Sequence, residues 1–197
     1  MKHSKDTRFS DEIAEEIGSK VIYMPNYVNN CDEAYDKLIN ELDWEHRGTT
    51  PRYEYYANDW NRSYAYGSEK NPKKFDPKPW HPVMLGIRYD LEKDFNCTFD
   101  VCFINMYRNK KDHLGWHSDD SPEMDTHRPI VTVSLGAERN FWFRRIGGEE
   151  VYSVFLENGS ACVMPARFQE TYQHRIPKHD RDCGPRLSLT FRGFVDV

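Results

Sequence analysis

The chain has 197 residues, of which 38% are hydrophobic and 30% charged, and its formal net charge is −5. This length and composition are typical of one globular domain and exclude collagen-like, membrane-embedded and fully disordered chains. The negative charge also excludes general adhesion to nucleic acid, which depends on clustered Lys and Arg, so any contact with nucleic acid must be local.

The start of the chain is predicted to hold little regular structure before the first strand. Residues 1–18 are polar and charged, and we expect a flexible N-terminal segment in which Ser10 caps one short helix. Residues 21–25 are typical of a short strand, and residues 31–44 repeat apolar side chains at helical spacing. The helix over 31–44 should therefore pack on a sheet through one face.

A long irregular segment follows this helix. Residues 48–80 are rich in Tyr, Asn, Pro and Lys and show little alternation. Loops of this length inside a compact domain are usually functional lids or linkers, and the aromatic content favours a lid. A second helix is predicted over about 81–94, where apolar positions again recur at helical spacing.

The rest of the chain is predicted to form a β-rich core over about 99–194. Short β-branched and aromatic runs are separated by turn signals such as Gly147-Gly148. Many short strands preceded by two helices favour an α+β fold, in which helices buttress a β-sandwich or jelly roll within a single domain over 19–197. The expected strands lie at 99–107, 130–135, 141–145, 151–156, 160–165 and 186–193.

Cysteine usage and hydropathy indicate where the protein works. The five cysteines show no close pairing, so the sequence predicts neither a disulfide framework nor a cysteine zinc site. The N-terminal residues contain no apolar signal-peptide core, and no stretch approaches the roughly 20 apolar residues that a membrane span requires. We therefore expect a cytoplasmic or nuclear monomer with no membrane association and no obligate protein partner.

One short motif contains the residues best suited to bind a metal ion. His117 and Asp119 are two residues apart in a strand-to-loop segment, so their side chains project to the same side, and a later strand with His174 would supply a third ligand. Two His and one carboxylate on one face of an octahedron leave positions open for a cosubstrate and O2, as in non-haem Fe(II) oxygenases. Taken alone, the motif also fits an exposed loop.

A zinc site is the competing interpretation of these histidines. His113 and His117 have the i, i+4 spacing of two ligands on a helix, as in the HExxH zinc motif. The pattern lacks the Glu that acts as general base, and Gly115 lies between the histidines where a helix is required. The sequence therefore favours an iron site over zinc hydrolysis.

The last predicted strand alternates between apolar and polar side chains. Leu187, Leu189 and Phe191 face one way, whereas the even-numbered positions from Arg186 to Arg192 face the other. The arginine side could be the water-exposed face of an edge strand. It could also lie inside a barrel, where a buried guanidinium requires an anion such as a dicarboxylate. The metal motif favours the second arrangement.

Several segments together resemble the AlkB family of Fe(II)/2-oxoglutarate-dependent dioxygenases, over roughly Pro51 to Phe194. They occur in the family's order and at sensible spacing. The segments are NMYRN at 105–109, WHSDD at 116–120, PIVTVSLGA at 129–137, QHRIP at 173–177 and PRLSLTFR at 185–192. The resemblance implies a core that is a double-stranded β-helix, or jelly roll.

The resemblance also implies which residues hold the metal and the cosubstrate. The iron ligands implied are His117, Asp119 and His174. Arg186 would bind the distal carboxylate of 2-oxoglutarate, and Arg192 would lie near the carboxylate that chelates iron. The full set implied for 2-oxoglutarate is Asn105, Tyr107, Arg186, Ser188 and Arg192.

A further segment, YAYG at 64–67, resembles the family's nucleotide-recognition hairpin, in which an aromatic residue stacks on an extruded base. The substrate-side residues implied are Tyr64, Tyr66, Asp120, Ser121 and Arg144. Two positions depart from the family's pattern. Ser121 stands where an acidic residue usually contacts the base, which leaves the accepted base open. Ser188 replaces an Asn of the cosubstrate pocket, and its hydroxyl could partly replace the amide.

The activity implied is oxidative demethylation of N-alkylated bases, such as 1-methyladenine and 3-methylcytosine, in DNA or RNA. Fe(II), 2-oxoglutarate and O2 take part, and formaldehyde, succinate and CO2 are released. Two other functions stay open. One is a hydroxylase of the same fold acting on a protein or a small molecule. The other is a binding module without activity, which the intact iron and cosubstrate positions disfavour.

Overall fold

The computed structural model describes residues 2–4, 21–68 and 71–195, with the side chains of 2–4, 66–68 and 71–72 left out of the description. Most of the N-terminal segment predicted to be flexible, including the helix expected after Ser10, lies outside the described residues. In the described part, none of the helices has the length and hydropathy to cross a membrane.

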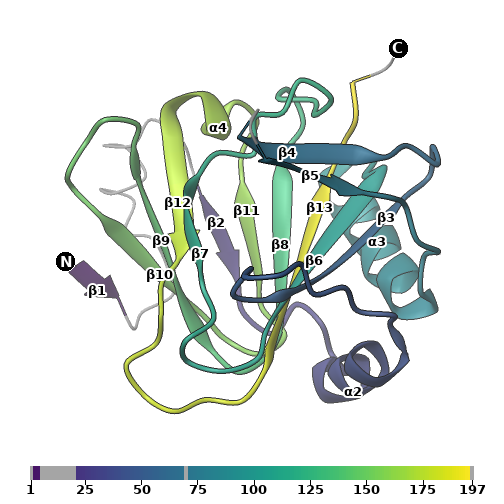
Figure 1. Ribbon diagram of the computed structural model, residues 1–197, viewed down its shortest axis with the longest axis horizontal. Coiled ribbons are helices and arrows are strands. Elements are labelled where there is room, and N and C mark those ends of the chain that lie inside the picture. The colour runs from purple at the N-terminus through teal and green to yellow at the C-terminus, as the bar shows by residue number, and fades with distance from the viewer. Residues whose placement is uncertain (1, 5–20, 69–70, 196–197) are drawn as a thin grey trace.

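Two sheets face each other across the core (Figure 1). The first has the strand order β1 (Lys2–Ser4), β10 (Tyr152–Leu156), β9 (Arg139–Arg145), β12 (Tyr172–Ile176) and β7 (Leu114–His117). The second has the order β2 (Ile22–Met24), β11 (Ala161–Met164), β8 (Ile130–Gly136), β13 (Arg186–Arg192), β6 (Val101–Tyr107) and β3 (Tyr53–Asn58). All pairings within these sheets are antiparallel except β1 with β10.

Helices α2 (Cys31–Glu41) and α3 (Pro82–Phe95) cover the outer face of the second sheet (Figure 1). Leu38 of α2 and Leu91 of α3 are fully buried in the same cluster as Leu187 and Leu189 of β13. This packing confirms that both predicted helices bury an apolar face on a sheet. A further helix, α4 (Phe168–Thr171), is short and leads directly into β12.

Strand β13 is the strand that was predicted to carry Arg186 and Arg192 on one side, and the structure shows where each side faces. Leu187, Leu189 and Phe191 pack in the cluster that the two helices cover. Arg186 and Arg192, on the opposite side, are also buried, and they face the interior between the two sheets rather than water. The interpretation as a solvated edge strand is therefore wrong, because β13 lies between β8 and β6 in the middle of its sheet.

A separate hairpin, β4 (Tyr64–Ser68) with β5 (Asn71–Phe75), lies over one end of the sheets (Figure 1). Its Tyr64 and Phe75 are buried against Phe103 of β6. Strand β3, which lies in the segment predicted as a lid, pairs along its whole length with β6 and belongs to the sheet. The α+β jelly-roll fold class is confirmed.

Gly136 shows why a glycine is needed where β8 meets helix α2. Its φ is +86°, and a Cβ atom there would lie 2.5 Å from Tyr35 Cε2 and 2.6 Å from the Pro185 carbonyl oxygen. We expect Gly136→Ala to lower the free energy of unfolding by about 2–4 kcal/mol, since backbone strain and overpacking add. Urea denaturation measures this change.

Gly86 in α3 is the matched control, because a Cβ there meets nothing within 4 Å. Gly86→Ala should raise stability by about 0.5–1 kcal/mol, because alanine loses less conformational freedom in a helix. Equal effects of the two substitutions would contradict the role of the close approach at Gly136.

Candidate metal centre and adjoining pocket

The two histidines and the aspartate of the HxD…H pattern converge at one point between the sheets. His117 ends β7 and lies directly opposite His174 of β12, with ring centroids 4.2 Å apart. The Nε2 atoms of His117 and His174 lie 3.7 and 3.8 Å from the carboxylate oxygens of Asp119. One possible ligand atom from each residue lies within 4.8 Å of the others, so the three side chains could hold one metal ion.

Neighbouring groups fix how these side chains point. The Nδ1 of His117 donates to the Gly115 carbonyl oxygen at 2.9 Å, which leaves Nε2 as the ligand atom. The backbone N–H of Asp119 donates to Oε1 of Gln169 in α4 at 3.0 Å, and both residues are buried. Helix α4 thus holds the aspartate beside the strand that carries His174.

The local charges suit a cation. Burial lowers the pKa of both His117 and His174, the latter to about 3, with the neighbouring imidazole adding to the shift of His174. Burial raises the pKa of Asp119, but Arg192, which lies 2.9 Å away, and the two histidines outweigh it, so the pKa is below its usual range. The site therefore offers two neutral imidazoles and one carboxylate at neutral pH.

The zinc interpretation loses its geometric basis. His113 precedes β7, and residues 114–117 are a strand, so His113 and His117 are not one helical turn apart. In the described part of the chain, the one group of metal-ligating side chains within reach of each other is His117, Asp119 and His174.

A buried guanidinium lies deeper between the sheets. Arg186 is fully buried, its Nη2 donates to Ser134 Oγ at 2.8 Å, and its Cζ lies 5.5 Å from the centroid of the Tyr107 ring. Among the described residues, its Nε and Nη1 have no hydrogen-bond partner. Burial lowers the pKa of Arg186 to about 10, so it remains a cation at neutral pH. Such unpaired donors fit the carboxylate of a bound ligand.

The other residues expected to contact the cosubstrate connect this guanidinium to the metal centre. Ser188 and Arg192 follow Arg186 on the same side of β13, and the register sets Ser188 opposite Asn105 and Arg186 opposite Tyr107. A narrow cavity between the sheets is lined by Asn105, Tyr107, Ser188 and Arg192 together with the three candidate metal ligands. The structure thus brings this predicted set together.

A larger pocket of about 550 Å³ opens from the metal centre to the surface. Its lining includes His117 and Asp119 of the metal centre and the aromatic side chains of Tyr64 and Phe103. Asp120 and Ser121 line it as expected, with Asp120 exposed. The side chain of Tyr66 lies outside the described residues.

Two further residues of this region escaped the sequence analysis. Arg52 lines the pocket, donates from Nε to the Asn105 side-chain oxygen at 2.8 Å and forms an ion pair with the fully buried Glu54 at 2.8 Å. It therefore holds Asn105 in place. The sequence signal for these two residues is that Arg52 and Glu54 stand two positions apart, as charged residues on one side of a strand do. The prediction of residues 48–80 as a lid conceals this signal.

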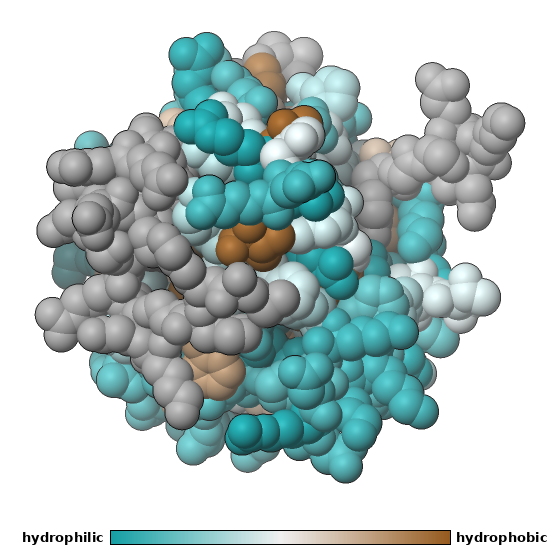
Figure 2. All heavy atoms as spheres, turned by 90° about the vertical axis from the view of Figure 1, so that its left-hand side faces the viewer, coloured by the Kyte–Doolittle hydropathy of each residue, from teal (hydrophilic) through white to brown (hydrophobic). Residues whose placement is uncertain are grey.

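Arg144 is not brought into the pocket. It directly follows Phe143 on β9, and Phe141 and Phe143 face the interior, so the side chain of Arg144 points to the outer face of the sheet. There its Cζ lies 4.3 Å from the centroid of the Trp116 ring. Figure 2, which views the molecule from the left-hand side of Figure 1, shows mostly hydrophilic side chains where the surface is coloured.

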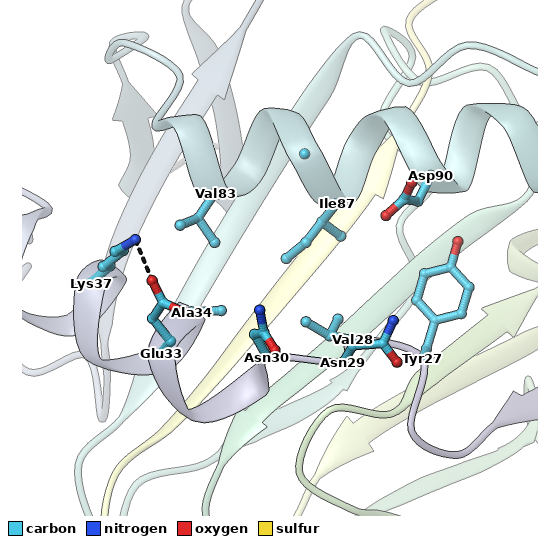
Figure 3. A pocket seen from close by; sticks show the side chains of 11 residues that line it. Tyr27, Val28, Asn29, Asn30, Glu33, Ala34, Lys37, Val83, Ile87 and Asp90 are labelled. Atoms are coloured by element: carbon cyan, nitrogen blue, oxygen red, sulfur yellow. Dashed lines mark hydrogen bonds and ion pairs between the residues drawn. The ribbon is translucent and has the colours of Figure 1, made fainter.

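A second cavity, of about 340 Å³, lies between α2 and α3 (Figure 3). Val83 and Ile87 point into it from α3, and the ion pair between Lys37 and Glu33 lies at one end. In the described part of the chain, no metal-ligating group of three is found in its lining.

Comparisons with known proteins agree with this geometry. The family model described as the 2OG-Fe(II) oxygenase superfamily matches residues 20–192. The human alpha-ketoglutarate-dependent dioxygenase alkB homolog 3 is 30% identical over 189 residues, covering 88% of this chain and 66% of that protein. The bovine DNA oxidative demethylase ALKBH2 is 29% identical over 191 residues, covering 93% of this chain and 64% of that protein.

A solved structure supports the fold. The structure of OsALKBH1 superposes with a TM-score of 0.64 at 15% identity, covering 87% of this chain and 96% of that chain. This chain therefore shares the fold of that protein, and it spans about two-thirds of the length of the two relatives named above.

The metal centre generates a direct test. We expect His117→Ala, Asp119→Ala or His174→Ala to weaken binding of Mn(II), measured by calorimetric titration, by more than about a hundredfold and to abolish turnover, because neighbouring groups cannot replace a lost ligand. Circular dichroism should show the fold retained. His113→Ala is the control and should bind like the unaltered protein, since His113 lies outside the cluster. Tight binding by His174→Ala would refute the assignment.

Proposed function

Because this chain belongs to the AlkB family within the 2OG-Fe(II) oxygenase superfamily, we propose that it removes methyl groups from ring nitrogens of nucleobases in DNA or RNA. It is a dioxygenase that uses Fe(II), 2-oxoglutarate and O2. The observation that carries the proposal is the set of two neutral imidazoles and one carboxylate beside a pocket whose lining includes aromatic side chains.

In this proposal His117, Asp119 and His174 hold the iron. When bound, Fe(II) with 2-oxoglutarate and O2 supplies the oxidant that hydroxylates a methyl group, and a hydroxymethyl group on a ring nitrogen then leaves as formaldehyde. The chain itself supplies orientation and exclusion of water. Both sheets contribute to this, since His117 and His174 come from one sheet and Arg192, which is paired with Asp119, from the other.

We further propose that 2-oxoglutarate lies along the inner side of β13. The unpaired donors of Arg186 would receive its distal carboxylate, and Tyr107 would pack beside it. Asn105, fixed by Arg52, and Ser188 line the space between Arg186 and the metal centre. Arg192 would stabilise Asp119 and the nearby carboxylate end of the cosubstrate.

The size and the aromatic lining of the outer pocket support a nucleobase as its ligand. Its volume of about 550 Å³ is in the range of pockets that bury small ligands, and its aromatic side chains can contact a flat ring. One relative, the bovine protein, has a name that states DNA demethylation. Tyr66 of the hairpin stays our prediction for the side chain that stacks on the base.

The Arg186 assignment predicts a cosubstrate defect. Arg186→Ala should raise the 2-oxoglutarate concentration needed for half-maximal rate at least tenfold, since a buried carboxylate that loses its guanidinium costs about 2–5 kcal/mol. Arg186→Lys should restore only part of it, because lysine cannot form the planar fork. Calorimetric binding of 2-oxoglutarate to the Mn(II)-loaded protein gives a second readout. An unchanged titration for both variants would place the carboxylate elsewhere.

The proposed reaction itself is tested by mass spectrometry of oligonucleotides. Single-stranded DNA and RNA carrying 1-methyladenine or 3-methylcytosine, incubated with Fe(II), ascorbate and 2-oxoglutarate, should lose the methyl group with matching release of formaldehyde and succinate. His174→Ala should give none of these products. Succinate formation with every oligonucleotide left methylated would instead favour a hydroxylase that acts on a protein or small molecule.

A further inference from the structure

Arg139 is a second guanidinium that is buried near the proposed cosubstrate position. It begins β9 of the first sheet and is 1% exposed. Its two terminal nitrogens donate to the backbone carbonyl oxygens of Asn109, Asp112 and Pro177, and its side chain also forms a hydrogen bond with that of Cys183. None of these partner groups is a carboxylate. Among the described residues, the charge of Arg139 therefore has no ion-pair partner.

Arg139 and Arg186 approach the same aromatic ring from opposite sheets. Their Cζ atoms lie 5.6 and 5.5 Å from the centroid of the Tyr107 ring. Arg186 and Tyr107 belong to the second sheet, whereas Arg139 belongs to the first. Burial lowers the pKa of Arg186, and the charge of Arg139 adds to this shift. The two cations are therefore close enough to repel each other.

The other buried arginines of the described structure are paired with buried carboxylates. Arg52 lies 2.8 Å from Glu54, and Arg192 lies 2.9 Å from Asp119. The two guanidinium groups beside Tyr107 have no such partner, although the aromatic ring offsets part of the cost of burying them. Buried charge without a counter-ion is unfavourable, so this surplus of positive charge points to an anion that a ligand supplies.

The acid next to this pair does not balance the charge. Asp112 offers its backbone carbonyl oxygen to Arg139, but its carboxylate is held by Arg108. The Nε and Nη2 atoms of Arg108 donate to the two carboxylate oxygens at 2.7 and 2.9 Å. The pair of Arg108 and Asp112 is thus neutral as a unit and leaves the positive charge of Arg139 and Arg186 uncompensated.

We infer that Arg139 is a positioning residue that makes the cosubstrate site selective for a dicarboxylate over a monocarboxylate. This inference rests on the proposed function, in which the distal carboxylate of 2-oxoglutarate meets the unpaired donors of Arg186. Arg186 contacts the carboxylate, and Arg139 adds a second positive charge that attracts it at longer range. A 2-oxo acid that ends in a methyl group carries no charge at that end and gains nothing from Arg139.

A purely structural role for Arg139 predicts a different result. The carbonyl oxygens that it binds belong to the segment between β6 and β7 and to the residue after β12, so the side chain also ties these segments to β9. Loss of these ties would lower stability and weaken the binding of every cosubstrate analogue alike. The ratio of the affinities for two analogues separates the two roles.

The test titrates the Mn(II)-loaded protein in a calorimeter with 2-oxoglutarate and with 2-oxopentanoate, in which a methyl group replaces the distal carboxylate. Arg139→Gln keeps hydrogen-bond donors and removes the charge. We expect it to weaken binding of 2-oxoglutarate at least about fivefold and to change that of 2-oxopentanoate by less than about twofold. Arg139→Lys should keep most of the affinity for 2-oxoglutarate, because the charge remains. Arg145→Gln, at the exposed other end of β9, is the control and should change neither value.

A second pair of variants leaves Arg139 and its ties in place. Cys183→Asp sets a carboxylate beside the guanidinium, and Cys183→Asn sets a neutral side chain of the same shape there. The aspartate variant should bind 2-oxoglutarate at least about threefold more weakly than the asparagine variant, because a paired Arg139 no longer attracts the distal carboxylate. Both variants should bind 2-oxopentanoate equally. This comparison also holds where Arg139→Gln does not fold.

Equal weakening of both ligands by Arg139→Gln, or the same ratio of affinities in Cys183→Asp and Cys183→Asn, would overturn the selective role and leave the proposed function standing. If the unaltered protein bound 2-oxoglutarate no better than 2-oxopentanoate, the cosubstrate position proposed along β13 would fail and this inference with it.

Discussion

The structure depends on keeping one carboxylate ionised inside a protein interior. Asp119 is buried, and burial alone would favour its neutral form. The guanidinium of Arg192 at 2.9 Å reverses that preference. Because Asp119 follows β7 of one sheet and Arg192 ends β13 of the other, the ion pair forms only when the two sheets pack face to face. Assembly of the core and assembly of the metal site are therefore the same event.

Strand β13 links stability and chemistry in a second way. One side, with Leu187, Leu189 and Phe191, builds the core under the helices, and the other side carries Arg186 and Arg192 into the site. A shift of one residue in register would exchange the two sides, burying guanidinium groups among apolar side chains. Hydrogen bonding to β8 on one side and β6 on the other fixes that register.

Sequence patterns predicted the strands in which apolar residues alternate locally. They missed the features that depend on contacts with residues distant in the sequence. Strands β8 and β13 were predictable because β-branched and apolar residues alternate there over several positions. Strands β7 and β12 are short and mix His, Trp, Gln and Arg, so they carry no such signal. The burial of Glu54 on β3 is understandable through its ion pairs with Arg47 and Arg52, and the Arg52 side chain also bonds Asn105. The outward direction of Arg144 likewise follows from the register of β9.

The arrangement also separates the parts of the site that must stay constant from those that can vary. The proposed cosubstrate positions on β6 and β13 and the candidate ligand His174 on β12 lie on strands that pair with a neighbour on both sides, whereas His117 ends the edge strand β7 and Asp119 follows it. The segment from Asp120 to Glu123 follows a strand and is pinned by the backbone near Val195, so its side chains can change without disturbing the ladder.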